Sequence, residues 1–155
     1  MKNFITSLSC LVSLVAVGTM LVTPAFAATP AQEKAFVDSY KKAYESKDAK
    51  ALQAMLYTKG ADPMALDFYK MMITADMGAT LSSIMLVDLT AEDSKKLESG
   101  KSPDGRPMNM TLKPVKKLVL KTSTKSASGS STGSSESFVA EFEGKLVIPV
   151  PASGK

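Results

Sequence analysis

The chain of 155 residues contains no histidine, no tryptophan and a single cysteine. Without histidine, nucleophilic catalysis that depends on an imidazole base is excluded, and so is a histidine-ligated zinc site. The length fits one domain, because domains commonly run to about 100–150 residues. The absences leave two classes open: chemistry based on carboxylates and tyrosines, or a protein that only binds.

The first 27 residues have the pattern of a secretory signal. Lys2 gives a positive start, Leu8 to Val22 is mostly apolar, and Ala25 and Ala27 are small residues at positions that signal peptidase accepts. The apolar run is shorter than the roughly 20 residues of a membrane-spanning helix, so we expect no transmembrane segment. The sequence predicts cleavage after Ala27 and a secreted or periplasmic protein.

Removal of this segment changes the composition of what remains. Cys10 is lost, so residues 28–155 contain no cysteine and cannot form a disulfide in an oxidising compartment. Of the 19 basic and 15 acidic residues only Lys2 is lost, which leaves 18 against 15 and a net charge of +3. A segment of this length can bury a core without a disulfide, and we expect one domain over 28–155.

The first half of this domain has helical signals. Thr29 and Gln32 form the pattern of a capping box around Pro30, and apolar residues follow at helical spacing: Phe36, Val37, Tyr40, Ala43 and Tyr44. Asp48 predicts the start of a second short helix, ended by Gly60 and carrying an apolar stripe made of Ala51, Leu52, Met55 and Leu56.

A third helix is predicted to begin at Asp62-Pro63 and to close near Gly78. Its inward stripe would be Leu66, Tyr69, Met72, Ile73 and Met77. A strand over Leu81–Leu89 follows, then a short helix capped by Thr90, and then turn residues from Gly100 to Pro107.

From Pro114 the hydrophobic period changes to two, which indicates strands. The serine- and glycine-rich segment 126–136 is predicted to be a flexible hairpin loop, followed by strands over Ser137–Phe142 and Leu146–Val150. The order predicts an α+β fold in which N-terminal helices pack on a curved antiparallel sheet.

Two stretches resemble the cone-shaped nuclear-transport-factor-two-like superfamily, which includes SnoaL-like and steroid-isomerase-like domains. They are Phe36–Tyr40 continuing through Lys47–Leu52, and Glu143–Ile148, where Leu146 stands at a position that is aromatic in that superfamily. The resemblance implies a conical pocket between sheet and helices. Members use that pocket for catalysis, ligand binding or protein association, and pairing through the sheets implies a homodimer.

Isomerase-like members combine a carboxylate base with a tyrosine hydroxyl in the cone. The candidates here are Asp67, Asp76, Tyr40, Tyr44 and Tyr69. The structural alternative is that Asp67 favours a helix N-terminus and that Tyr40 and Tyr44 belong to a core stripe.

The tyrosines and the methionines of the third helix also suggest an apolar ligand site. The predicted set is Tyr40, Tyr44, Tyr69, Met72 and Met77. Methionine clusters can hold copper(I) in an oxidising compartment, but methionine more commonly fills gaps in a core, so we expect no metal and no cofactor.

Lys117, Lys121 and Lys125 fall on one face of a predicted strand, with no acidic residue between Asp104 and Glu136. They could bind an anionic surface, or they could protect a sheet against aggregation. Nucleic acid is not expected for a secreted chain with few aromatic residues near the lysines.

Taken together, these patterns favour a secreted, non-catalytic domain that binds a small apolar ligand or a protein partner. A cofactor-free isomerase-like or hydrolase-like enzyme with an aspartate–tyrosine pocket is the first alternative. A module that binds anionic surfaces through the three lysines is the second.

Overall fold

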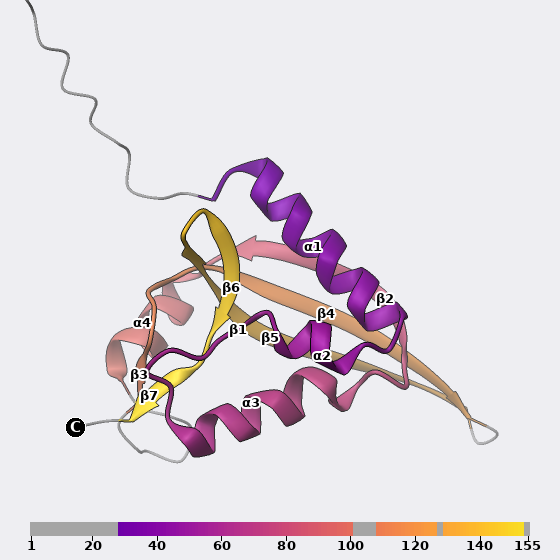
Figure 1. The fold of residues 1–155 in the computed structure, drawn as a ribbon. Coiled ribbons are helices and arrows are strands. Elements are labelled where there is room, and N and C mark those ends of the chain that lie inside the picture. The colour runs from indigo at the N-terminus through magenta and orange to yellow at the C-terminus, as the bar shows by residue number, and fades with distance from the viewer. Residues whose placement is uncertain (1–27, 101–107, 127–128, 154–155) are drawn as a thin grey trace, which may run out of the picture.

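The computed structural model describes residues 28–100, 108–126 and 129–153, so the predicted signal segment and the predicted turn after Gly100 lie outside the described residues. The chain combines helices with strands, as the α+β prediction requires (Figure 1). The helices are α1 (Pro30–Glu45), α2 (Ala49–Gln53), α3 (Pro63–Ala75) and α4 (Ala91–Ser99). The strands are β1 (Leu56–Tyr57), β2 (Thr80–Asp88), β3 (Met108–Met110), β4 (Pro114–Ser126), β5 (Gly129–Phe142), β6 (Lys145–Pro149) and β7 (Pro151–Ser153).

Side-chain caps fix where the helices begin. The predicted capping box of α1 is confirmed: the Thr29 hydroxyl accepts from the Gln32 amide at 3.3 Å, and the Gln32 side chain accepts from the Thr29 amide at 2.6 Å. The Gln32 side chain also donates to the carbonyl of Gly144 at 2.7 Å. The start of α1 is therefore tied to the turn between β5 and β6.

The three later helices begin at the predicted residues as well. Asp48, Asp62 and Thr90 each accept from a backbone amide in the first turn of α2, α3 and α4. The second helix is shorter than predicted, however. It ends at Gln53, and Leu56 lies in β1, opposite Ile148 of β6.

The main sheet has five strands in the order β1-β6-β5-β4-β2 and is not closed. The predicted antiparallel sheet needs correction, because β1 runs parallel to β6 while the other pairs are antiparallel. A parallel neighbour requires a crossover, and α3, β2, α4, β3, β4 and β5 all lie between β1 and β6 along the chain. β3 and β7 form a separate two-stranded sheet.

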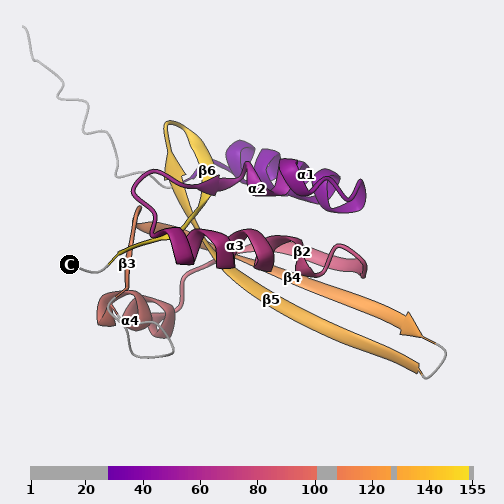
Figure 2. The same ribbon diagram turned by 60° about the horizontal axis from the view of Figure 1, so that its bottom comes forward.

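The predicted flexible loop over 126–136 is wrong, because residues from Gly129 onward belong to β5. This strand pairs with β4 from Gly129 to Ala140, and the two form a long hairpin (Figure 2). Thr122 lies opposite Gly133, and a Cβ at Gly133 would come within 2.9 Å of the Thr122 hydroxyl oxygen. The hydrogen bonds that pair two strands join main-chain amides to main-chain carbonyls, and serine and glycine have both groups. A serine- and glycine-rich composition therefore did not prevent pairing.

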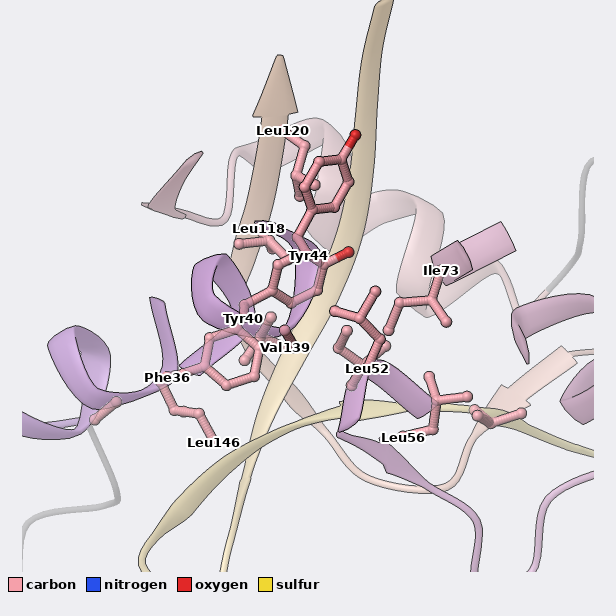
Figure 3. Close-up of a cluster of buried hydrophobic side chains, with 14 residues drawn as sticks. Phe36, Tyr40, Tyr44, Leu52, Leu56, Ile73, Leu118, Leu120, Val139 and Leu146 are labelled. Carbon is pink, nitrogen blue, oxygen red and sulfur yellow. The ribbon is translucent and has the colours of Figure 1, made fainter. Parts of the chain in front are cut away.

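The core lies between α1, α2, α3 and the strands β4, β5 and β6 (Figure 3). Leu52, Leu118 and Val139 have no exposed surface, and Ile73 brings α3 into the same cluster. Leu118 and Leu120 alternate along β4 with Lys117 and Val119, so the core covers one surface of this strand and leaves the other outside.

Candidate functional site

Tyr40 and Tyr44 fill the interior of the protein. Their exposed fractions are 4% and 3%, and the rings extend from α1 into the core cluster, with Phe36 beside Tyr40 (Figure 3). The pKa of Tyr40 is raised far above its ordinary value, first by burial and then by the neighbouring Tyr44 and Asp76. Both tyrosines thus behave as core residues at neutral pH, protonated and enclosed.

The Tyr44 hydroxyl connects α1 to the end of α3. It donates to the backbone carbonyl of Asp76, with the carbonyl of Ala79 also near at 3.3 Å. Burial is the largest cause of the raised pKa of Tyr44, followed by the charge of Asp76. Because its one proton is directed at backbone acceptors, Tyr44 has no free proton to donate to a substrate oxyanion.

The two aspartates of the predicted catalytic set lie on the surface. The side chain of Asp67 is 81% exposed and forms an ion pair with Lys70 at 3.6 Å. Asp76 is exposed at the C-terminal cap of α3. Within the described part of the chain, neither carboxylate forms a hydrogen bond with a tyrosine hydroxyl, so the structure does not assemble the carboxylate–tyrosine pair.

Two grooves lie at opposite ends of α1. The larger has a volume of about 350 Å³ and lies between α1, the segment after α2 and the β5–β6 turn; it is lined by Gln32, Ala35, Phe36, Ser39, Ala54, Met55, Gly144, Lys145, Leu146 and Val147. The smaller, of about 210 Å³, includes Tyr44 and Met77 of the predicted ligand set. Tyr40, Tyr69 and Met72 line neither of these two grooves.

The three lysines of β4 have different environments. The side chain of Lys117 is only 13% exposed, and its amine lies 3.1 Å from both Asp93 of α4 and Glu136 of β5. Hydrogen bonds to these carboxylates raise the pKa of Lys117. Lys121 and Lys125 are exposed. Lys117 therefore holds α4 to the sheet, and only two of the three lysines are available to an external anion.

The most unusual surface was not among the predicted sites. Met64, Phe68 and Met71 on α3 are exposed by 72%, 55% and 63%, and we call these three residues the α3 stripe. Residues four and three positions apart are neighbours on a helix surface. The sequence contains a signal for this surface. Within Pro63–Ala75 the only charged residues are Asp67 and Lys70, and the only serine or threonine is Thr74. A helix that is apolar on nearly all sides has an apolar face left over after its inner face is buried.

The helix that carries the α3 stripe is anchored near both of its ends. At its start, Asp62 caps the first turn and its amide donates to the carbonyl of Pro151 at 2.9 Å. Near its end, Ile73 is buried and Tyr44 donates to Asp76. The ring of Phe68 meets the edge of the partly buried Tyr69, with centroids 6.2 Å apart. Tyr69 has a raised pKa because of burial.

Comparison with known proteins gives no relative: no protein-family model, curated protein or solved structure matches this chain. Among residues 28–100, 108–126 and 129–153, no helix combines the length and apolarity needed to cross a membrane. The same residues contain no group of three acidic side chains placed to hold a metal ion.

Proposed function

We propose that this chain is a secreted, non-catalytic binding domain that recognises a protein partner through the α3 stripe. The observation that carries the proposal is the exposure of Met64, Phe68 and Met71, by 55–72%, on a helix anchored at both ends. Exposed apolar surfaces of this kind mark interaction sites, and methionine and phenylalanine are enriched in protein interfaces.

A protein partner fits this surface better than a small ligand does. A small-molecule site encloses most of its ligand in a concave pocket, whereas the α3 stripe lies on the outside of a helix. Apolar anchors at positions i, i+4 and i+7 are typical of a helix that docks against a groove or another helix. Methionine side chains are flexible, so they can adapt to a partner surface.

The proposal includes secretion directed by residues 1–27 and the cone-like packing implied by the resemblance to the nuclear-transport-factor-two-like superfamily. Protein association is one of the uses to which that superfamily puts its fold, which is consistent with the α3 stripe. The isomerase-like and hydrolase-like alternatives have less support, because the side chain of Asp67 is 81% exposed and pairs with Lys70. The alternative based on Lys117, Lys121 and Lys125 has less support because Lys117 is already paired.

Photocrosslinking in the cells that produce the protein tests the proposal. Phe68 is replaced by the photoreactive residue p-benzoylphenylalanine in the full chain, and Lys42, exposed on α1, is replaced in the same way as a matched control. We expect a covalent adduct of defined mass from position 68 and none from position 42. A chain that stays free of adducts at position 68, or that labels equally from both positions, would contradict the proposal.

A further inference from the structure

The larger of the two grooves beside α1 is open because small residues line its walls. Ala35 on α1, Ala54 after α2 and Gly144 in the β5–β6 turn all line it, and none has a side chain larger than a methyl group. Gly144 has a φ of +75°, a backbone conformation that favours glycine, so this position stays without a side chain. The volume of about 350 Å³ lies within the range of small-molecule sites.

Hydrogen bonds and an ion pair hold the walls of this groove in place. The side chain of Gln32 donates to the carbonyl of Gly144 at 2.7 Å, which ties α1 to the β5–β6 turn. Glu33, the next residue, pairs with Lys116 of β4 at 3.0 Å, which ties α1 to the sheet. Because both contacts exist within the chain itself, the groove is formed without a ligand, and little ordering is required when one binds.

The lining of the groove is mostly apolar and has a single charge. Its large apolar side chains are those of Phe36, Met55, Leu146 and Val147. Lys145 is the only charged residue among the lining, since Glu143, two positions before it, does not line the groove. Lys145 is exposed and forms no ion pair with another described residue. Its amine is therefore available to an anion.

The shape of the groove places this charge near one end. Along α1 the lining runs from Gln32 to Ser39, which corresponds to about 10 Å of helix axis. Lys145 follows Gly144, and Gly144 accepts from Gln32, so the charged residue lies near the Gln32 end. An elongated apolar space with a cation near one end is complementary to an apolar chain with an anionic head group.

We propose that this groove binds a free fatty acid, with the alkyl chain between α1 and the β5–β6 turn and the carboxylate at Lys145. A methylene group is similar in size to a water molecule, which occupies about 30 Å³, so the groove has room for about ten carbon atoms. Because Lys145 is exposed, burial of the chain supplies most of the affinity. No residue of α3 lines the groove, so this ligand is additional to the partner of the α3 stripe.

Calorimetric titration with decanoate, below the concentration at which it forms micelles, tests the inference. Native and variant chains are purified from the cells that produce the protein, and the native chain should bind one decanoate. Ala35→Trp fills the groove and should abolish binding. The matched control is Ala91→Trp, the same substitution at an exposed residue of α4 outside the groove, which should bind like the native chain. Undiminished binding by Ala35→Trp would overturn the inference.

The role of Lys145 is tested with ligands of the same chain length and different charge. Lys145→Gln should weaken decanoate binding about two- to fivefold, as expected for an exposed ion pair, and should leave decanol binding unchanged. Lys121→Gln, an exposed lysine outside the groove, is the control and should not weaken it. Decyltrimethylammonium should bind more weakly than decanoate to the native chain, and equal binding of the two would overturn the proposed role of the charge.

Nuclear magnetic resonance locates the ligand without any substitution. The amide signals of Ala35, Ala54 and Val147 should shift during the decanoate titration, whereas that of Phe68 on α3 should not. Shifts confined to α3 would overturn the inference, and so would binding to phosphatidylglycerol vesicles with none to free decanoate. A photoadduct from position 68 in a chain that binds no decanoate would overturn this inference alone and leave the proposed function standing.

Discussion

At the scale of single residues, Asp93 shows how a charge can be buried at low cost. It is 4% exposed, and its carboxylate accepts from the amide of Thr90 at 3.0 Å, from the Thr90 hydroxyl at 2.7 Å and from Lys117. The hydrogen bonds from Thr90, followed by Lys117, lower the pKa of the Asp93 carboxyl to about 2, against the opposing effect of burial. Thr90 was predicted as the cap of a helix, but the link from Asp93 to Lys117 required the folded structure.

Asp93→Asn should lower the free energy of unfolding at neutral pH by about 1–3 kcal/mol, because it removes a charged acceptor from a buried pair. The folded-state pKa of Asp93 lies below the unfolded value of about 4, so its stabilisation is full above that pH and is lost as the pH falls towards 2. Urea unfolding should show the difference between native and variant chains shrinking over this window. Glu98→Gln, at an exposed position of the same helix, serves as the control. A difference that stayed constant with pH would assign the effect to packing instead.

At the scale of helices and strands, the sequence predicted where the helices begin better than it predicted which strands pair. The caps at Thr29, Asp48, Asp62 and Thr90 were identified correctly, because a cap depends on residues within one turn. The pairing of Leu56 with Ile148 joins residues that are distant in the chain, and no local pattern indicates such a contact. The sequence correctly predicted that Ile73 faces the core from α3. Phe68 was overlooked because the α3 stripe has the same helical spacing as the inward residues, and spacing alone does not say which set is buried.

Gly133→Ala tests whether the serine- and glycine-rich segment is a strand. Its new Cβ would meet the buried Thr122 hydroxyl at 2.9 Å, so we expect a loss of about 1–3 kcal/mol in the free energy of unfolding. In a combined variant, Thr122→Ala should reduce the cost of Gly133→Ala, which a double-mutant cycle measures.

The matched control for this prediction is Gly78→Ala, where a Cβ would meet nothing within 4 Å. It should leave the stability nearly unchanged. If Gly133→Ala were as mild as this control, the close pairing of Thr122 with Gly133 would be refuted.

At the scale of the whole molecule, Tyr40 and Tyr44 are buried in the core cluster, whereas the α3 stripe lies on the outside. Lys116 links α1 to the sheet through Glu33 at 3.0 Å and Asp88 at 2.8 Å, and Tyr44 links α1 to the end of α3. The sequence predicted the inward tyrosines but placed function among them. The composition of α3 indicates a helix that is apolar on most sides, but which of its residues stay exposed is a property of the folded chain.

The α3 stripe also makes the surface sensitive to oxidants, because two of its three side chains are thioethers. Dilute hydrogen peroxide should convert Met64 and Met71 to sulfoxides faster than the partly buried Met72 on the same helix, as peptide mass spectrometry can measure. Equal rates for the three methionines would contradict the exposures described. A sulfoxide is polar, so peroxide should weaken association through α3, and a variant with Met64→Leu and Met71→Leu should be insensitive. Although residues 28–155 contain no cysteine, the protein would then respond to redox conditions reversibly, since reductases restore methionine.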